Sequence, residues 1–257
     1  MMFSIIVPNY NNGAWLSRCL ESIARQRRKD YEVIFIDDVS TDNSYDIYEE
    51  WTDRLPATYG IKLSEKHYNG GARNVGLKYR HGLYTLFLDS DDCLADETCL
   101  DRIGDVIKDN DYPDLIRLSY LVCKDGEEWP ADLSAQDTTE KILASNSVAC
   151  WTKCVKSDKV VRFPENTLME DVVQHLAQLD AVDTVATCKG PIIKWNRDNA
   201  NSCSTNMELQ NGKWRSSLYR FYADLLDLKV NRDVTKFELL KRQSMALDNI
   251  RNERFEQ

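Results

Sequence analysis

A short apolar run that breaks off into acids constrains this chain more than any other stretch. Residues 84–88 read Tyr-Thr-Leu-Phe-Leu, and Asp89, Asp91 and Asp92 follow within four positions. An apolar run of this length with polar flanks predicts a buried strand, and parallel sheets bind ligands at the carboxyl ends of their strands. The three carboxylates are therefore expected where a ligand binds.

Two interpretations of these acids compete. If the backbone stays extended, Asp89 and Asp91 lie on one face, where a hard cation such as Mg²⁺ or Mn²⁺ would relieve the repulsion between them. Alternatively, the acids form a solvated turn that caps the next helix. Taken alone, the triplet favours the turn, so the rest of the chain has to decide.

The preceding sequence repeats the same arrangement. Apolar runs at 3–7, 32–36 and 61–63 predict further strands, with Pro8 ending the first and Asp37-Asp38 following the second. Helical spacing fills the intervals, from 15 to 24, from Ser40 or Thr41 to Trp51, and from 72 to 79, and a further helix is expected after Asp96. Alternating strands and helices predict a parallel sheet. The GxGxxG of a dinucleotide fold is missing after the first strand.

The second half is less periodic. Residues 115–124 and Asp125-Gly126 predict a hairpin into 127–129. Helices are expected near 138–143 and from Asp171 onward. After residue 205, two amphipathic helices (214–226 and 234–250) would pack on the body, pair with a second subunit or lie on a membrane surface. The predicted units are 1–205, with a nucleotide-binding half (1–109) and an acceptor-binding half (110–205), and a helical extension, 206–257.

Charge and cysteine usage exclude several classes. The net charge is −9, and the excess of acid lies in residues 1–205, which argues against a nucleic-acid partner. A membrane-spanning run and a signal peptide are both missing from the sequence, which predicts a cytoplasmic location. The eight cysteines lack CxxC spacing and are expected to be free thiols.

Six segments in order resemble the inverting nucleotide-sugar glycosyltransferases of family 2, which have the GT-A fold. The matching segments are 4–11 (SIIVPNYN), 36–44 (IDDVSTDNS), 71–77 (GARNVGL), 86–92 (LFLDSDD), 163–165 (FPE) with Glu170-Asp171, and 195–197 (WNR) with Ser202 and Ser204. The resemblance implies an α/β fold with a mixed, mostly parallel sheet flanked by helices.

The resemblance also implies a nucleotide site. Pro8, Tyr10 and Asp38 would hold the base, with Asp38 accepting a hydrogen bond from the imide of uracil. Arg73 and Asn74 would also face the nucleotide. The donor implied is therefore a UDP-sugar.

The reacting groups follow from the same resemblance. Asp89 would contact the ribose and Asp91 would bind Mn²⁺ or Mg²⁺ at the diphosphate. Asp171 would remove the proton from the acceptor hydroxyl, and a helix amino terminus favours its ionised form. Asp92 and Glu170 would contact the acceptor or support the residues that do.

Two positions depart from the family pattern. Val39 replaces the usual glycine, so we expect a differently shaped turn there. The Trp195-Asn-Arg segment replaces a Tyr-rich motif near the diphosphate, and Arg197 is assigned to the donor, against the alternative of a surface arginine.

The expected activity is a metal-dependent, inverting transfer of a hexosyl or N-acetylhexosaminyl group to a hydroxyl acceptor, saccharide or lipid-linked, in polysaccharide or glycolipid synthesis. The alternatives are an inactive nucleotide- or partner-binding domain of this fold, and a sugar nucleotidyltransferase. Contact with the inner membrane face and a homodimer through the last helices remain open.

Overall fold

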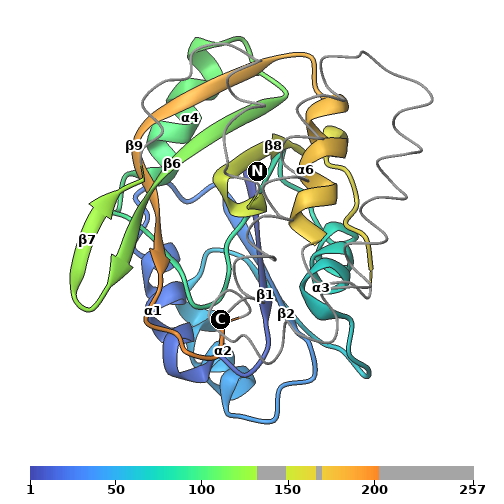
Figure 1. Cartoon of the computed structure of the whole chain (residues 1–257), viewed down its shortest axis with the longest axis vertical. Coiled ribbons are helices and arrows are strands. Elements are labelled where there is room, and N and C mark those ends of the chain that lie inside the picture. Colours follow the sequence, from blue (N-terminus) through green and yellow to red (C-terminus); the bar gives the residue numbers. More distant parts are fainter. Residues whose placement is uncertain (132–148, 166–169, 203–257) are drawn as a thin grey trace, which may run out of the picture.

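The computed structural model describes residues 1–131, 149–165 and 170–202 of the 257-residue chain. Within these residues a single nine-stranded sheet runs in the order β3-β2-β1-β4-β8-β6-β9-β5, with β7 paired to β6 (Figure 1). The first four strands in that order are parallel to one another. The predicted mixed, mostly parallel sheet flanked by helices is confirmed.

The first half alternates strands and helices because its apolar runs are separated by residues with helical spacing. The elements in order are β1 (Phe3–Asn9), α1 (Gly13–Ala24), β2 (Tyr31–Asp37), α2 (Ser44–Trp51), the short 3₁₀ helix η1 (Thr52–Arg54), β3 (Thr58–Lys62), α3 (Tyr68–Leu77), β4 (Tyr84–Phe87), β5 (Cys93–Leu94) and α4 (Cys99–Asp109).

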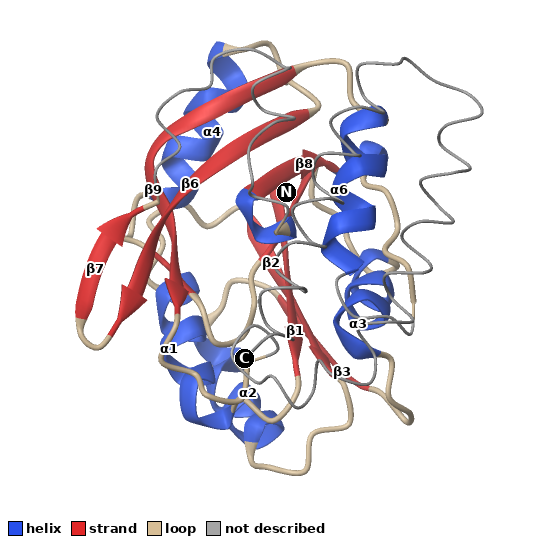
Figure 2. Cartoon of the chain, in the orientation of Figure 1, coloured by secondary structure: helices blue, strands red, loops and turns tan. Residues whose placement is uncertain are grey.

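Helices cover both faces of this half, with α1 and α2 on one side and α3 on the other (Figure 2). Alternate strand residues point to opposite faces. Ile5 and Phe35 belong to the large core that includes α1, α2 and α4, whereas Ile6 and Ile34 pack against α3. β1 and β2 are buried on both faces, which is why most of their residues are apolar; the buried Ser4 and Glu32 are hydrogen-bonded to each other.

The second half completes the sheet with antiparallel and parallel pairs. Its elements are β6 (Leu115–Lys124), β7 (Glu127–Pro130), the 3₁₀ helix η2 (Cys150–Thr152), β8 (Lys153–Lys156), the 3₁₀ helix η3 (Ser157–Lys159), α6 (Glu170–Asp180) and β9 (Val185–Asn196). β8 joins the halves, since it pairs antiparallel with both β4 and β6. The predicted Asp125-Gly126 hairpin connects β6 and β7.

Several boundaries differ from the predictions. β1 continues through Pro8 to Asn9, and α2 begins at Ser44 because the Asp42 side chain accepts a hydrogen bond from the Ser44 N–H (3.0 Å). β4 ends at Phe87, and a turn follows in which Asp92 N–H donates to Asp89 O (2.9 Å). Of the two interpretations of these acids, the backbone has the turn and not the extended strand.

Val39 adopts the backbone conformation that glycine would favour. Its φ is +64°, in the left-handed region, where a β-branched residue is strained by about 1–3 kcal/mol. The turn after Asp38 thus keeps a glycine-type conformation at Val39.

Other predictions concern thiols, membrane spans and the rest of the chain. Seven cysteines are free among the described residues. None of the helices in the described ranges is long and apolar enough to cross a membrane. The helices expected near 138–143 and within 206–257 lie outside the described residues.

Candidate functional site

The carboxyl ends of β1, β2 and β4 meet at one edge of the sheet and their loops are bonded together. Asn9 Nδ2 donates to Asp37 Oδ1 (3.0 Å), and Asp38 N–H donates to Asn9 O (2.8 Å). Asn12 Nδ2 reaches Ser90 Oγ (2.9 Å) in the acidic turn. The three strand ends therefore form one continuous site, as their parallel pairing requires.

The residues assigned to the base lie at the β1 and β2 side of this edge. Asp38 is buried, its Oδ1 accepts from His67 N–H (2.7 Å) and its Oδ2 pairs with Lys66 Nζ (3.1 Å). Lys66 also lies over the exposed ring of Tyr10, whereas Pro8 is buried within β1. A carboxylate oxygen accepts two hydrogen bonds, so Asp38 keeps capacity for a ligand.

Arg73 joins carboxylates from distant parts of the sequence. Its side chain projects from α3 with 1% of its surface exposed, and Nη2 pairs with Asp89 Oδ1 (2.7 Å). Nη1 pairs with Glu170 Oε1 (2.7 Å) and with Asp171 Oδ1 (3.2 Å), both in the first turn of α6. One guanidinium thus holds the acidic turn and the α6 carboxylates together, and its charge is directed at protein acids.

Asn74 fixes the segment that precedes α6. Its Nδ2 donates to Phe163 O (2.9 Å) and to Glu165 Oε1 (3.0 Å), and its Oδ1 accepts from Phe163 N–H (2.9 Å). The Arg73 guanidinium lies 5.3 Å from the Phe163 ring. Both α3 residues assigned to the nucleotide therefore contact the second half of the chain.

The acidic turn is bonded to the end of β9. Asp91 Oδ2 accepts from Asn199 Nδ2 (2.7 Å), which also donates to Asn12 Oδ1 (3.1 Å). The Asp92 Oδ1 atom accepts from Asn196 N–H (2.8 Å). Asp92 therefore anchors the turn to a strand.

Three asparagines of the site carry no functional signal in the sequence: Asn12, Asn196 and Asn199. The sequence predicts only a turn at Asn12, and Asn196 lies inside the Trp195-Asn-Arg segment without chemistry of its own. Asn199 has no signal at all, because its contact with Asp91 spans 108 positions.

Burial raises the pKa values of the clustered acids. Burial and the neighbouring Asp89 charge raise the pKa of Asp91 to about 6, and burial raises the pKa of Asp92 well above its ordinary range. The pKa of Glu170 rises to about 7 through burial and repulsion by Asp171, although Arg73 opposes the rise.

The pKa of Asp171 is also subject to opposing effects of burial and neighbouring charges. Burial raises its pKa, while Arg73, Lys153 and the Cys150 N–H hydrogen bond lower it. The helix amino terminus therefore does not by itself keep this carboxylate as acidic as a free aspartate. Arg73, Lys153 and the Cys150 N–H are the groups that favour its ionised form.

The acidic turn fits a divalent cation only in part. Asp89 and Asp91 are close enough for the charge of one to raise the pKa of the other, which a cation between them would reverse. No group of three or more His, Cys, Asp or Glu side chains is arranged to hold a metal ion in residues 1–131, 149–165 and 170–202. A cation here would need ligands from a substrate, as Mg²⁺ and Mn²⁺ commonly have at phosphate sites.

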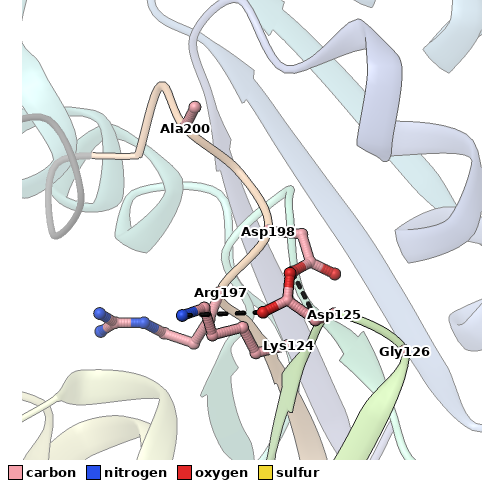
Figure 3. A pocket seen from close by; sticks show the side chains of 6 residues that line it. All are labelled: Lys124, Asp125, Gly126, Arg197, Asp198 and Ala200. Atoms are coloured by element: carbon pink, nitrogen blue, oxygen red, sulfur yellow. Dashed lines mark hydrogen bonds and ion pairs between the residues drawn. The ribbon is translucent and has the colours of Figure 1, made fainter.

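Arg197 lies beyond the end of β9 beside an open pocket of about 660 Å³. Figure 3 shows the pocket between the β6–β7 turn and the segment after β9, lined by Lys124, Asp125, Gly126, Arg197, Asp198 and Ala200. Asp125 N–H donates to Asp198 Oδ1 (2.8 Å), and the Arg197 guanidinium stacks 4.5 Å from the Trp195 ring. Ser202 is within the described residues, whereas Ser204 is outside them.

Solved structures share this fold. Staphylococcus aureus TarS 1–349 in complex with UDP-GlcNAc superposes with a TM-score of 0.79 at 22% identity, over 93% of this chain and 70% of that chain. The mannosyltransferase PcManGT from Pyrobaculum calidifontis, in complex with GDP-Man and Mn²⁺, has a TM-score of 0.65 at 15% identity, over 94% of this chain and 68% of that one. These likenesses support the GT-A fold.

Curated relatives match over part of their length. The poly(ribitol-phosphate) beta-N-acetylglucosaminyltransferase TarS of S. aureus is 38% identical over 178 residues, which is 64% of this chain and 30% of TarS. A PGL/p-HBAD biosynthesis glycosyltransferase of Mycobacterium bovis is 36% identical over 128 residues, half of each chain. The sequence model described as "Glycosyl transferase family 2" matches residues 4–149, more than half of this chain. The chain therefore belongs to glycosyl transferase family 2.

Proposed function

We propose that this chain transfers a sugar from a UDP-sugar to a hydroxyl group of an acceptor, with inversion at the anomeric carbon. The observation that carries the proposal is the Arg73 contact set, which holds Asp89 and Asp171 on one guanidinium. A donor bound at Asp89 and a base at Asp171 are then close enough to act on one sugar.

The donor would lie along the carboxyl edge of β1, β2 and β4. Pro8, Tyr10 and Asp38 would flank the base, Asp89 the ribose, and Arg197 the diphosphate. The uridine nucleotide is supported by the shared fold with TarS, whose solved complexes contain UDP-GlcNAc and UDP. A hexosyl or N-acetylhexosaminyl donor agrees with the names of relatives that transfer beta-glucosyl and beta-N-acetylglucosaminyl groups.

Asp91, with Asp89 beside it, would hold Mn²⁺ or Mg²⁺ together with the donor diphosphate. A cation bound there would neutralise the negative charge that develops on the departing diphosphate. The PcManGT complex, which contains Mn²⁺, supports the use of a divalent metal. Asn199 would orient the Asp91 carboxylate for binding the cation through its 2.7 Å hydrogen bond.

Asp171 is the better candidate for the base than Glu170. The side chain of Asp171 is 22% exposed and that of Glu170 is 8% exposed, so an acceptor can reach Asp171. As the acceptor oxygen bonds to the anomeric carbon, the bond to the diphosphate oxygen breaks and the hydroxyl proton passes to Asp171. Glu170 and Arg73 position Asp171 for this step.

The acceptor would be a saccharide or a lipid-linked molecule in polysaccharide or glycolipid synthesis. Relatives named for poly(ribitol-phosphate) and for PGL/p-HBAD biosynthesis support both classes. We propose a cytoplasmic location, with contact to the inner membrane face or dimerisation assigned to residues 206–257, which lie outside the described residues.

The proposal is tested by thermal unfolding with a panel of nucleoside diphosphates, with and without Mn²⁺. A ligand that binds the folded state alone raises the unfolding temperature. We expect UDP to stabilise the chain more when Mn²⁺ is present. If no nucleoside diphosphate raises the unfolding temperature with metal, the proposal is wrong.

Asp171→Asn tests the base. The amide retains the shape and the contact with Arg73 but does not take a proton at neutral pH. We expect sugar transfer to fall about 10²–10⁴-fold while UDP binding is unchanged. Asp53→Asn, in the exposed helix η1, is the matched control and should retain full activity. Normal transfer by Asp171→Asn would remove Asp171 from the mechanism.

A further inference from the structure

Among the residues that the structure describes, Arg117 is a buried cation without a counter-ion. The residue lies in β6 with 5% of its surface exposed, and its Nη2 atom is enclosed without a hydrogen-bond partner. No ion pair reaches its guanidinium from the residues that the structure describes. Burial also lowers the pKa of Arg117, in keeping with the lack of a described counter-ion. A buried charge is costly unless an opposite charge meets it, so this position calls for an anion.

A second cation lies directly across the sheet. Arg117 is the register partner of Lys153 in the antiparallel β6–β8 pair, and such partners point to the same face. Lys153 is 5% exposed, and its Nζ donates to Ala149 O (2.8 Å) and Thr152 Oγ1 (3.2 Å). Burial lowers the pKa of Lys153 to about 8; the neighbouring Cys150 and Asp171 oppose this shift, and the charge of Arg117 adds to it. The fold thus keeps two like charges together in its interior.

Helix α6 adds a third basic side chain. His175 is 1% exposed, and neither ring nitrogen has a hydrogen-bond partner among the described residues. Burial, with the charge of Lys153, lowers its pKa well below the ordinary value, so the imidazole is neutral. A neutral imidazole donates from one ring nitrogen, which would add an uncharged donor beside the two cations.

The position of this group relative to the base follows from helix and strand spacing. Asp171, His175 and Leu179 are four residues apart and lie on one face of α6. Leu179 packs against Leu115 and Val155, which are two residues along the strands from the two cations. The basic group therefore lies between this apolar contact and Asp171, and Figure 1 shows α6 next to β8.

We infer that Arg117, Lys153 and His175 bind an oxyanion of the phosphate type that belongs to the acceptor substrate. The guanidinium fork matches the oxygens of a phosphate, and the ammonium supplies a second charge. The group lies beside Asp171 rather than beside Asp91, so it faces the nucleophile side of the reaction. The substrate class is a phosphorylated polyol or sugar whose free hydroxyl lies next to its phosphate.

The assignment of the anion to the acceptor depends on the proposed function. The anion site itself depends on Arg117. The experiment therefore has two arms on the full chain. In the first, UDP with Mg²⁺ is tested for a rise in unfolding temperature. In the second arm, UDP and Mg²⁺ are kept at saturation and one additive is tested at a time. The additives are inorganic phosphate, glycerol 3-phosphate, glycerol, and sodium chloride at matched ionic strength.

We expect both phosphates to raise the unfolding temperature of the wild-type chain, and glycerol and chloride to have no such effect. Arg117→Met should unfold at a higher temperature than wild type without ligand, because it removes an uncompensated buried charge. The same variant should lose the phosphate-dependent increase and retain the increase with UDP. Lys153→Gln should reduce the phosphate-dependent increase in the same way. Arg54→Met, which removes a guanidinium stacked on Trp51, is the matched control and should retain it.

Three results overturn the anion site: no stabilisation by phosphate, equal stabilisation of Arg117→Met, or an Arg117→Met chain that is less stable than wild type or does not fold. Stabilisation by phosphate without any effect of UDP would instead contradict the proposed function and leave the anion site standing. An effect of UDP without one of phosphate would contradict the anion site and leave the proposed function standing.

Discussion

Two buried arginines of this chain differ in what surrounds them. Arg73 contacts Asp89, Glu170 and Asp171 at 2.7–3.2 Å, whereas no carboxylate pairs with Arg117 in the described part of the chain. The two side chains are similarly buried, at 1% and 5% exposure. The charge of the first arginine is balanced by three protein carboxylates, although its Nε atom, like Nη2 of Arg117, has no hydrogen-bond partner among the described residues. No described carboxylate balances the charge of the second arginine, so we assign that part to a bound anion. This difference separates a residue that supports the site from a residue that contacts a ligand.

The same substitution at each of the two arginines gives the strongest test of this comparison. Arg73→Met would leave three neighbouring carboxylates without their cation, and we expect the free energy of unfolding to fall by about 3–5 kcal/mol near pH 7.5. Arg117→Met should change it in the opposite direction. Urea unfolding of both variants measures the signs. If both substitutions destabilise the chain, the difference between the two arginines is one of degree.

The two sides of this comparison were not equally predictable from the sequence. The parallel strands and their converging acids were predictable because apolar runs and polar ends are local patterns. The partners of Arg73 were not, since they lie 16, 97 and 98 positions away and depend on how α6 packs. The family resemblance assigns Arg73 to the nucleotide, yet its described contacts are with protein acids.

Arg117 illustrates the limit more plainly. It lies in a β-type run in which nothing local distinguishes an inward arginine from an outward one. Its burial follows from the β6–β8 register, and that register brings together residues 36 positions apart. The acidic turn shows a similar limit, because the sequence left a turn and an extended strand as alternatives, and the Asn199 and Asn196 contacts that support the turn come from distant positions.

The burial of Glu170 predicts an unusual dependence of stability on pH. The pKa of Glu170 rises from 4.5 to about 7 on folding, so between these values the folded chain holds a proton that the unfolded chain has released. The contribution of Glu170 to stability is therefore full below pH 4.5 and is lost as the pH rises toward 7. Glu170→Gln, which is neutral throughout, should gain stability relative to wild type as the pH increases from 5 to 8.

Glu165 supplies the control with the opposite sign. Its hydrogen bond from Asn74 lowers the pKa of Glu165, so its contribution is present above pH 4.5 and is lost as the pH falls. Glu165→Gln should lose stability relative to wild type at pH 8, by a small amount because the side chain is 44% exposed. Urea unfolding at pH 5 and pH 8 measures both variants. An offset between Glu170→Gln and wild type that is independent of pH would show that the Glu170 proton is not held by folding.

Asp91 extends the comparison to a buried acid whose hydrogen bond comes from a neutral amide. Asn199→Ala removes the 2.7 Å hydrogen bond, and we expect a loss of about 1–2 kcal/mol of stability. Without this donor the pKa of Asp91 should rise further above its present value of about 6, so a larger fraction is protonated near neutral pH. The additional stabilisation that Mn²⁺ gives to the UDP complex should then fall at pH 6.5 and recover at pH 8.5. Asn201→Ala, at an exposed neighbouring position, should behave as wild type at both pH values. If Asn199→Ala weakens the effect of Mn²⁺ equally at both, the amide acts by placing the turn rather than by keeping Asp91 ionised.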